Sequence, residues 1–442
     1  MRLKASEVAE AVDGHLFGPD VALSGVCIDS RCVAEGDLFV ALVAARNGHQ
    51  YIAEAVSVGA AAYMTSQGLV QSAAGASPTQ ASAIQVNDTA VALVELGSYA
   101  RSCFVGPVVG ITGSVGKTSV KDMAAAVIGA QRSTHASPRS FNNELGVPLT
   151  LLSCPDEAEV MVVEMGARGK GHIARLCLQA RPTVGVVTAV GAAHTEMFGS
   201  IEAVVEAKGE LIEGLGAQGV AVLNADQALV AAMASRTAAE VLTFGRKNGD
   251  VRASRVQLNE GLQPRFWLET PAGRAQVLLS VCGEHMVDNA LAAAAVGVAL
   301  GVEVEAIAAG LATARLSPWR MEVVELASGG LLINDTYNAN PLSMAAGLHA
   351  LARLNRRRRV AVLGQMAELG ERSLAEHAAI GNLARELGIE VIAIGTSYYG
   401  TIPVVNADAV LLALGTIDAD AAVLLKGSRL AGLEKIALSF GC

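Results

Sequence analysis

The chain contains 442 residues, of which 52% are hydrophobic but only 4% aromatic, and its formal net charge is −9. A chain of this length is too long for one hydrophobic core, so we expect about three domains. The negative charge argues against nucleic acid or an anionic membrane surface as a partner. A composition dominated by Ala, Val, Leu and Gly is typical of α/β proteins, whose parallel strands are buried on both faces.

The cysteine and hydropathy patterns predict a soluble cytoplasmic protein. The seven cysteines are scattered without paired short spacings. This arrangement favours free thiols in a reducing compartment and gives no support for a zinc site. The longest apolar run, residues 290–302, is too short to cross a bilayer, so we expect no membrane insertion.

Residues 1–86 predict a small α/β domain. The expected elements are strands at residues 21–28, 37–42, 61–65 and 83–86, and helices at residues 5–12 and 51–59. A stretch at residues 67–82 without hydrophobic period predicts a loop. Ser30 and Arg31 directly follow a strand, where they either meet an anionic ligand or form an ordinary turn.

The most informative segment is the run Gly-Ile-Thr-Gly-Ser-Val-Gly-Lys-Thr-Ser at residues 110–119. It lies between a predicted strand at residues 107–112 and a predicted helix at residues 120–130. Glycines let the backbone turn its N–H groups toward anionic oxygens, and the start of a helix adds partial positive charge. Lys117 can reach the β- and γ-phosphates of a nucleotide, and the Thr118 hydroxyl can bind magnesium.

This segment departs from the general phosphate-loop pattern at one position. The pattern has glycine six residues before the lysine, where this chain has Ile111. The alternative is a glycine-rich turn that binds no ligand. The Gly-Lys-Thr-Ser sequence between a strand and a helix favours the phosphate loop.

Two further strands are predicted at residues 159–164 and 183–190, and polar residues lie at or after their carboxyl ends. Ligands bind at the carboxyl ends of parallel strands. Glu164 ends the first of these strands and His194 follows the second, so we expect both near Thr118 in a magnesium environment. Considered singly, Glu164 is better explained as a solvated charge at a strand end, and His194 as an ordinary loop histidine.

Lys208 occupies an unusual position on a predicted helix that begins after Ser200, a good N-terminal cap. It lies within the apolar stripe of that helix, whereas Glu206 and Glu210 are expected to turn away from it. A buried ammonium group is costly and needs a partner or a chemical change. Either the side chain reaches solvent, or it is carbamylated by CO₂ and becomes a carboxylate-like metal ligand.

The central block, residues 87–315, continues the α/β pattern. The expected elements are a strand ending at Leu223, a hairpin at residues 265–270 and 274–281, and a helix at residues 286–300. Asn289 lies early in that helix. Its amide is either structural or placed for adenine recognition.

Residues 316–442 restart strand–helix alternation. The expected elements are a hairpin at residues 320–326 and 331–335, strands at residues 360–363, 390–394 and 422–425, and a helix at residues 374–387. Asp335 ends one strand, and a Lys-Gly-Ser-Arg run at residues 426–429 ends another. Both positions are at carboxyl strand ends, where a ligand-facing loop is expected.

Several segments together carry a resemblance to a known family. They are Thr-Gly-Ser-Val-Gly-Lys-Thr-Ser (112–119), Ser-Phe-Asn-Asn-Glu-Leu-Gly-Val-Pro (140–148), Glu-Met-Gly (164–166), Gly-Ala-Ala-His (191–194), Ala-Lys-Gly-Glu (207–210), Asn-Ala-Asp (224–226), Asp-Asn-Ala-Leu-Ala-Ala (288–293), Asp-Thr-Tyr-Asn-Ala-Asn-Pro (335–341) and Lys-Gly-Ser-Arg (426–429). With them the chain resembles the Mur ligases, the ATP-dependent amino-acid ligases of peptidoglycan synthesis, along essentially its whole length. Tyr-Asn-Ala-Asn-Pro and Lys-Gly-Ser-Arg resemble most the member that adds D-alanyl-D-alanine.

The resemblance implies a three-domain α/β fold. It has an N-terminal domain for a UDP-sugar (1–86), a central P-loop parallel-sheet ATPase domain (87–315) and a Rossmann-like C-terminal domain for a dipeptide (316–442). It implies ATP and two magnesium ions, with Lys117, His194 and a carbamylated Lys208 as catalytic groups. The implied nucleotide contacts are Gly113, Ser114, Val115, Gly116, Lys117, Thr118, Ser119, Asn289, Arg320 and Asp335. The implied metal ligands are Thr118, Glu164, His194 and Lys208.

The implied reaction is ligation of D-alanyl-D-alanine to UDP-N-acetylmuramoyl-tripeptide through an acyl phosphate, by a cytoplasmic monomer. The implied substrate contacts are Ser30, Arg31, Asn142, Asn143, Tyr337, Asn338, Asn340, Lys426, Ser428 and Arg429. The alternatives are another ligase of the superfamily, such as folylpolyglutamate synthase or a different Mur ligase, and a non-catalytic nucleotide-binding scaffold. A guanine-specific switch should carry Asn-Lys-x-Asp, whereas the nearest segment here is Asn-Ala-Asp at residues 224–226.

Overall fold

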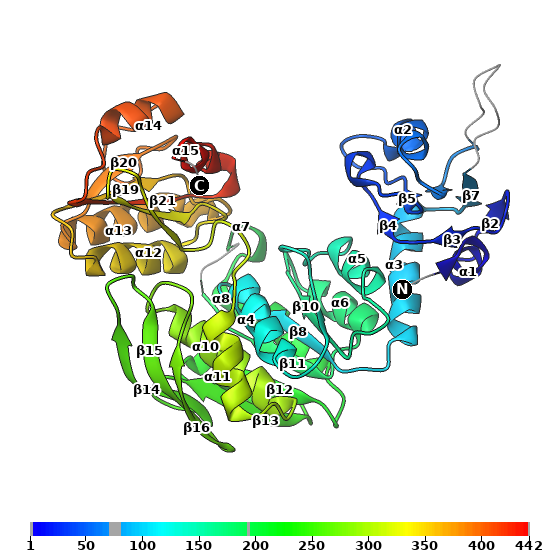
Figure 1. Ribbon diagram of the computed structural model, residues 1–442, viewed down its shortest axis with the longest axis horizontal. Coiled ribbons are helices and arrows are strands. Elements are labelled where there is room, and N and C mark those ends of the chain that lie inside the picture. The colour runs from blue at the N-terminus through cyan, green and yellow to red at the C-terminus, as the bar shows by residue number, and fades with distance from the viewer. Residues whose placement is uncertain (1–2, 70–80, 192–194, 441–442) are drawn as a thin grey trace. The chain divides into compact units, whose positions relative to one another are not determined.

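The computed structural model describes residues 3–69, 81–191 and 195–440, and the chain forms two compact units (Figure 1). Unit 1 comprises Met1–Val108, Ser133–Met165 and Arg175–Pro182. Unit 2 comprises Val109–Arg132, Gly166–Ala174 and Thr183–Cys442. His194 and most of the loop predicted at residues 67–82 lie outside the described residues. The expected domain boundaries after residues 86 and 315 stay predictions.

Unit 1 contains a five-stranded sheet of order β2-β7-β6-β5-β4, a two-stranded sheet and the parallel pair β9–β10. An element divided by a unit boundary is placed with the unit that holds most of its residues. The elements of unit 1 are β1 (Leu3–Lys4), α1 (Ala5–Ala11), β2 (His15–Phe17), β3 (Ala22–Leu23), β4 (Val26–Cys27), η1 (Ser30–Cys32), β5 (Leu38–Val40), η2 (Gly48–Tyr51), α2 (Ile52–Ser57), β6 (Ala62–Thr65), β7 (Ser82–Gln85), α3 (Thr89–Cys103), β9 (Thr134–Ala136), α5 (Gly146–Leu152), β10 (Val160–Glu164) and α6 (His172–Ala180).

The strands β4 to β7 of unit 1 run parallel, and β2 is antiparallel at the edge. Their apolar side chains form a core with Phe39, Ile52 and Tyr63 at its centre. The single strand predicted at residues 21–28 is two short strands instead. β3 pairs with β1, whereas β4 pairs with β5, so a break between them lets each join a different sheet.

The first part of unit 2 contains a mostly parallel sheet of order β16-β15-β14-β13-β12-β11-β8. Its elements are β8 (Val108–Thr112), α4 (Lys117–Gly129), β11 (Val184–Val187), α7 (Thr195–Phe198), α8 (Ile201–Glu213), β12 (Val220–Asn224), α9 (Ala228–Ala231), η3 (Ala232–Arg236), β13 (Glu240–Gly245), β14 (Val251–Leu258), β15 (Pro264–Thr270), β16 (Gly273–Leu278), α10 (Met286–Ala299) and α11 (Val304–Thr313).

All strands of this sheet from β8 to β14 pair in parallel, and the predicted hairpin β15–β16 completes it antiparallel. The central strands are fully buried, which explains their continuous apolar sequence. Helix α4 packs against α10 and α11. This packing brings the start of α10 to the phosphate-loop end of α4, although the two helices are far apart in sequence.

The second part of unit 2 contains a five-stranded sheet of order β17-β18-β21-β19-β20. Its elements are β17 (Glu322–Glu325), β18 (Leu331–Asp335), α12 (Pro341–Arg353), β19 (Arg358–Leu363), η4 (Gly370–Arg372), α13 (Ser373–Glu386), β20 (Glu390–Ala393), α14 (Ala407–Leu414), β21 (Ala421–Lys426), η5 (Arg429–Ala431) and α15 (Glu434–Ser439).

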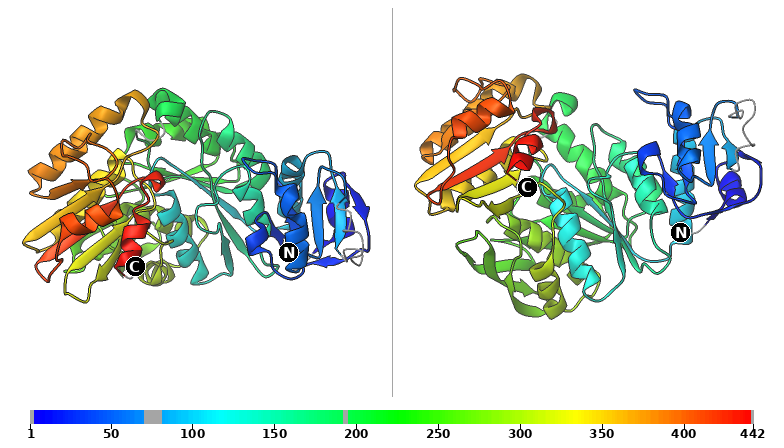
Figure 2. Two further views of the ribbon diagram at one scale, coloured as in Figure 1. Left: turned by 90° about the horizontal axis from the view of Figure 1, so that it is seen from above. Right: turned by 45° about the horizontal axis from the view of Figure 1, so that its top comes forward.

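Only β17 is antiparallel in this second sheet, so a Rossmann-like arrangement is confirmed. Figure 1 shows α12 and α13 on one face and α14 and α15 on the other, and Figure 2 shows the same sheet, coloured yellow to red, from two further directions. The apolar side chains of α14 and α15 pack on Val360, Val423 and Leu425. Among the helices of the described residues, none is both long and apolar enough to cross a membrane.

His377 on α13 links this helix to the loop that follows β19. Its ring is 0% exposed. Its Nδ1 donates to the Ser373 carbonyl at 2.6 Å, and its Nε2 accepts the Met366 N–H at 2.9 Å. Protonation of Nε2 would remove this acceptor, and burial lowers the pKa of His377 below its ordinary value. The neutral ring therefore fixes the loop.

We expect His377→Gln to reduce the acid sensitivity of folding. In the unfolded chain this histidine binds a proton near pH 6.5, but the native state binds it only at lower pH, so native stability falls as pH decreases through this range. Each pKa unit between the two states corresponds to ~1.4 kcal/mol. The fall in melting temperature between pH 7.5 and 5.5 should be smaller in His377→Gln than in the unmodified chain. The exposed-residue control His349→Gln should keep the full fall, and equal falls in all three proteins would contradict the assignment.

Candidate active site

The phosphate loop connects β8 to α4 through two glycines that no other residue could replace without strain. Gly113 has φ +152° and Gly116 has φ +82°. A Cβ on Gly113 would lie 2.0 Å from Thr188 Oγ1, and a Cβ on Gly116 would lie 2.5 Å from Asn289 Oδ1. The loop therefore needs glycine for both backbone conformation and close packing. The predicted strand–loop–helix order is confirmed.

Hydrogen bonds hold the backbone of this loop in place. Thr188 Oγ1 donates to the Val115 carbonyl at 2.5 Å. Ser114 N donates to the Ala189 carbonyl at 2.7 Å. Lys117 is half-buried, and its Nζ donates to the Gly113 carbonyl at 2.8 Å. These contacts fix the loop ahead of the first turn of α4, where Thr118 and Ser119 are buried.

We expect Gly116→Ala to damage this loop, whereas Gly129→Ala should not. Alanine at position 116 adopts a left-handed backbone, which costs about 1–2 kcal/mol, and its methyl group collides with Asn289. At Gly129, in the last turn of the same helix, an added Cβ meets no atom of the described residues within 4 Å. Titration with Mg-ADP should show at least about tenfold weaker binding for Gly116→Ala. Equal affinities of the two variants would show that the loop does not bind the phosphates.

Arg320 approaches the phosphate loop from the segment before β17. Its Nη2 donates to Thr118 Oγ1 at 2.8 Å. Its guanidinium lies over the ring of Tyr337, 4.2 Å from the ring centre. The ring limits the orientations of the guanidinium, so a fixed positive charge lies beside the first turn of α4. The structure thus brings together Thr118 and Arg320, two nucleotide contacts that the resemblance implied, and Tyr337, an implied substrate contact.

A second cluster lies at the carboxyl end of β18 and β21. Lys426 is 1% exposed, and its Nζ contacts Asp335 Oδ2 at 2.5 Å and the Asn338 carbonyl at 3.1 Å. An ion pair at this depth persists only with such well-placed partners. The Ser428 hydroxyl, two residues on, is buried and has no hydrogen-bond partner among the described residues. An unpaired buried hydroxyl is costly, so Ser428 is a candidate ligand contact.

The other predicted residues that follow β18 and β21 make contacts that stabilise the local structure. Asn340 caps α12, accepting the Ser343 N–H at 3.0 Å. Arg429 is exposed, and its guanidinium lies over Trp319 at 4.5 Å from the ring centre. Asn338 is exposed and its side chain accepts the Ala339 N–H. These contacts hold the loop edges in place around Lys426.

Lys208 lies in the apolar stripe of α8 and is only 2% exposed, so its side chain does not reach solvent. The expectation for Glu210 was wrong, because this side chain is also buried. Its carboxylate accepts the N–H groups of Gly171 at 2.5 Å and Ala174 at 3.0 Å. It thus caps the start of α6, and a negative charge is favourable there. Glu206 does turn outward, to an exposed ion pair with Lys170.

Unit 1 holds five more of the predicted residues. Glu164 ends β10, is 1% exposed, and accepts from Asn142 Nδ2 at 2.7 Å. Asn143 is exposed and its side chain accepts the Gly146 N–H at the start of α5. Ser30 is buried, with its hydroxyl 3.3 Å from Glu54 Oε2.

Arg31, also in unit 1, is exposed and pairs with Asp29. Hydrogen bonds from Arg31 hold the pKa of the Asp29 carboxyl at about 2. The guanidinium is therefore presented on the surface by a fully ionised neighbour.

The predicted metal ligands are Thr118, Glu164, His194 and Lys208. His194 lies outside the described residues. Within residues 3–69, 81–191 and 195–440, no group of three His, Cys, Asp or Glu side chains is arranged to hold a metal ion. Thr118 supplies a hydroxyl oxygen, which is a ligand type that magnesium accepts.

Two family models match the chain. The Mur ligase middle domain matches residues 111–297, and the Mur ligase glutamate ligase domain matches residues 319–429. The first match covers the phosphate loop and the start of α10. The second covers Arg320 and the cluster around Lys426.

Curated proteins and solved structures agree with these matches. The chain is 42% identical over 426 residues to the UDP-N-acetylmuramoyl-tripeptide–D-alanyl-D-alanine ligase of Mycobacterium tuberculosis strain H37Rv, covering 90% of this chain and 84% of that protein. It superposes on MurF from Acinetobacter baumannii with a TM-score of 0.88 at 29% identity, covering 100% and 99% of the two chains. MurF ligase from Thermotoga maritima, solved in complex with ADP, gives a TM-score of 0.81 at 30% identity, covering 94% and 96%.

Proposed function

Because this chain belongs to the Mur ligase family, we propose that it joins D-alanyl-D-alanine to a UDP-N-acetylmuramoyl-tripeptide in an ATP-dependent reaction that passes through an acyl phosphate. The observation that carries the proposal is the phosphate loop with its two obligatory glycines, in a chain matched over most of its length by ligases of this name. An amide bond cannot form directly from a carboxylate at useful rates, so the acid must first be activated.

The bond changes follow from this chemistry. A carboxylate oxygen of the tripeptide attacks the γ-phosphorus, and the bond from that phosphorus to ADP breaks. The dipeptide amine then attacks the acyl carbon, loses a proton, and phosphate leaves with the carboxylate oxygen. Phosphoryl transfer needs charge neutralisation and alignment more than covalent help. Lys117 and Arg320 supply positive charge beside the loop for this purpose.

Magnesium belongs to the proposal as the partner of the nucleotide. Thr118 would hold it, because its hydroxyl lies in the first turn of α4. When bound, magnesium neutralises charge on the phosphates and lets two anions approach each other. A second ion near His194 and a carbamylated Lys208, and Glu164 as a further metal ligand, are also parts of the proposal. Carbamylation is proposed because Lys208 lies in the apolar stripe of α8 and is only 2% exposed.

We assign the substrates to the remaining predicted contacts. The dipeptide would meet the edge formed by Tyr337, Lys426 and Ser428, where the buried Ser428 hydroxyl supports a ligand contact. The UDP-sugar would meet unit 1 at Ser30 and Arg31, and the exposed guanidinium of Arg31 supports recognition of an anionic group. Asn142 and Asn143 complete the set. The monomeric state and a cytoplasmic location stay predictions.

Phosphate release tests the proposal. The purified chain should release phosphate from ATP only when the muramoyl-tripeptide and D-alanyl-D-alanine are both present, in equal amounts to the ligated product. Replacing the tripeptide by tetrahydrofolate and the dipeptide by glutamate tests a folylpolyglutamate synthase. Turnover with the folate pair alone would contradict the proposal. Absence of ATP hydrolysis with every pair, while Mg-ADP still binds, would favour a non-catalytic scaffold.

A further inference from the structure

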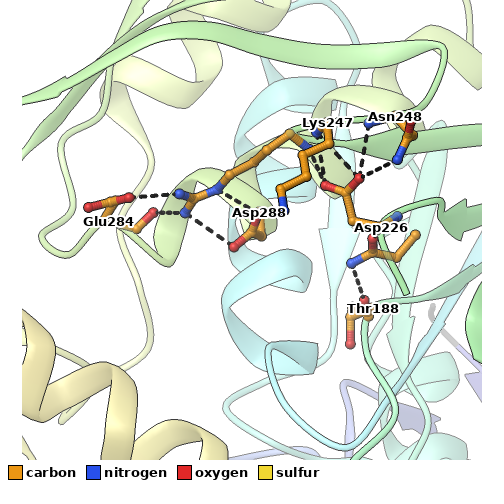
Figure 3. A network of polar contacts seen from close by, with 8 residues as sticks. Thr188, Asp226, Lys247, Asn248, Glu284 and Asp288 are labelled. Atoms are coloured by element: carbon orange, nitrogen blue, oxygen red, sulfur yellow. Dashed lines mark hydrogen bonds and ion pairs between the residues drawn. The ribbon is translucent and has the colours of Figure 1, made fainter. Parts of the chain in front are cut away.

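The Asn-Ala-Asp segment at the end of β12 organises a network of polar contacts that the proposed reaction does not use (Figure 3). The Asp226 carboxylate accepts the backbone N–H groups of three successive residues after β13. The distances are 2.6 Å to Arg246, 3.0 Å to Lys247 and 3.0 Å to Asn248. One carboxylate thus fixes the turn that presents the Arg246 side chain.

This network reaches the phosphate loop at one end. Asn224 Oδ1 accepts the Asp226 N–H at 3.0 Å, and Asn224 Nδ2 donates to the Thr188 carbonyl at 3.2 Å. Thr188 is the residue whose hydroxyl braces the Val115 carbonyl. The turn that carries Arg246 is therefore connected by hydrogen bonds to the backbone of the phosphate loop.

At its other end the network holds the start of α10. Arg246 Nε donates to Asp288 Oδ1 at 2.8 Å, and its Nη1 donates to Glu284 Oε1 at 2.9 Å. Its Nη2 donates to the Glu284 carbonyl and also to Asp288 Oδ2 at 3.2 Å. The second Glu284 oxygen accepts from Arg353 of α12 at 3.2 Å. A planar guanidinium that joins two carboxylates and a carbonyl gives directional restraint, unlike an isolated surface ion pair.

Asn289 follows directly after Asp288 and contacts the phosphate loop. A Cβ on Gly116 would lie 2.5 Å from Asn289 Oδ1, so this amide already stands against the loop. A small displacement of the first turn of α10 would move the amide away from the loop or into it. The network restrains both sides of this contact, the loop through Thr188 and the helix through Asp288.

We propose that Arg246, held by Asp226, is a positioning residue that sets Asn289 against the phosphate loop and thereby tunes nucleotide affinity. Arg246 acts through the first turn of α10 rather than on the nucleotide. The inference rests on the proposed nucleotide site. It adds a specific role for the Asn-Ala-Asp segment, which lies outside the phosphate loop.

Titration of the full chain with Mg-ADP tests the positioning role by a double-mutant cycle. Arg246→Met should weaken Mg-ADP binding about tenfold, the effect of losing one charge-assisted restraint. Arg246→Lys should recover only part of this loss, because an ammonium group cannot join the same four oxygens. In an Asn289→Ala background, Arg246→Met should add less than about twofold, because the residue through which it acts is gone.

A matched control is Arg252→Met, which removes an exposed ion pair with Glu269 on β14 and β15. This variant should bind Mg-ADP as the unmodified chain does. If Arg246→Met does not fold, Asp226→Asn offers a milder change of the same turn and should weaken binding in the same direction. Unchanged affinity in Arg246→Met, or additive losses in the double variant, would overturn the positioning role alone. Absence of Mg-ADP binding by the unmodified chain would instead contradict the proposed function.

Discussion

Lys117→Ala should abolish ATP-dependent ligation while leaving the fold intact. The ammonium group lies at the start of α4 and contacts the Gly113 carbonyl inside the loop that would enclose the phosphates. Its removal takes away the positive charge that balances the transferring phosphoryl group. Loss of one charge-stabilising group typically lowers turnover by about 10²- to 10³-fold. The rate of ligated-product formation at saturating ATP measures this effect.

The control for Lys117→Ala is Lys435→Ala, which removes an exposed lysine from α15. Both variants should keep the melting temperature of the unmodified chain within a few degrees, since neither removes a buried apolar group. Turnover of Lys435→Ala should be unchanged. Near-normal turnover of Lys117→Ala would refute the assignment of the phosphate loop.

Lys208→Ala should be the second severe variant, and it should differ from the first in being chemically rescued. If Lys208 carries a carbamate, its loss removes an anionic group at a buried position of α8, and turnover should fall by at least about 100-fold. Formate or acetate can enter the space left by the side chain and restore an anionic oxygen. Ligation rates measured against carboxylate concentration should therefore rise and saturate.

Lys208→Met is the matched control for this rescue, because its side chain fills most of the space and carries no charge. It should be as inactive as Lys208→Ala and should not respond to added carboxylate. Full activity of Lys208→Ala without any additive would remove the carbamate from the account. If both variants are inactive and carboxylates rescue neither of them, Lys208 has a structural role only.

Features that depend on a short stretch of the chain could be predicted from the sequence. The strand–loop–helix order around Lys117, both hairpins and the N-terminal cap of α8 at Ser200 are confirmed. The place of Lys208 within the apolar stripe of α8 was also predicted correctly, although the sequence left open whether its side chain reaches solvent. In each case the signal is the local spacing of apolar, glycine or capping residues, which acts before any tertiary contact forms.

Long-range polar contacts could not be predicted from such patterns. Arg320 meets Thr118 across 202 residues, Lys426 meets Asp335 across 91, and Arg246 meets Asp288 across 42. The expectation for Glu210 was wrong for the same reason, because the helix start that it caps belongs to a distant segment. The sequence around a charged helix residue does not show whether its side chain contacts water or another element of the fold. Predicting that Glu210 accepts the N–H groups at the start of α6 would have required knowledge of the fold.

The most direct test of the central claim follows the carboxylate oxygen. The muramoyl-tripeptide is labelled with ¹⁸O in its terminal carboxylate, and the phosphate released during ligation is analysed by mass spectrometry. An acyl phosphate transfers one labelled oxygen to each phosphate released, so the product phosphate should be heavier by one ¹⁸O substitution. Unlabelled phosphate accompanying normal peptide product would contradict the account.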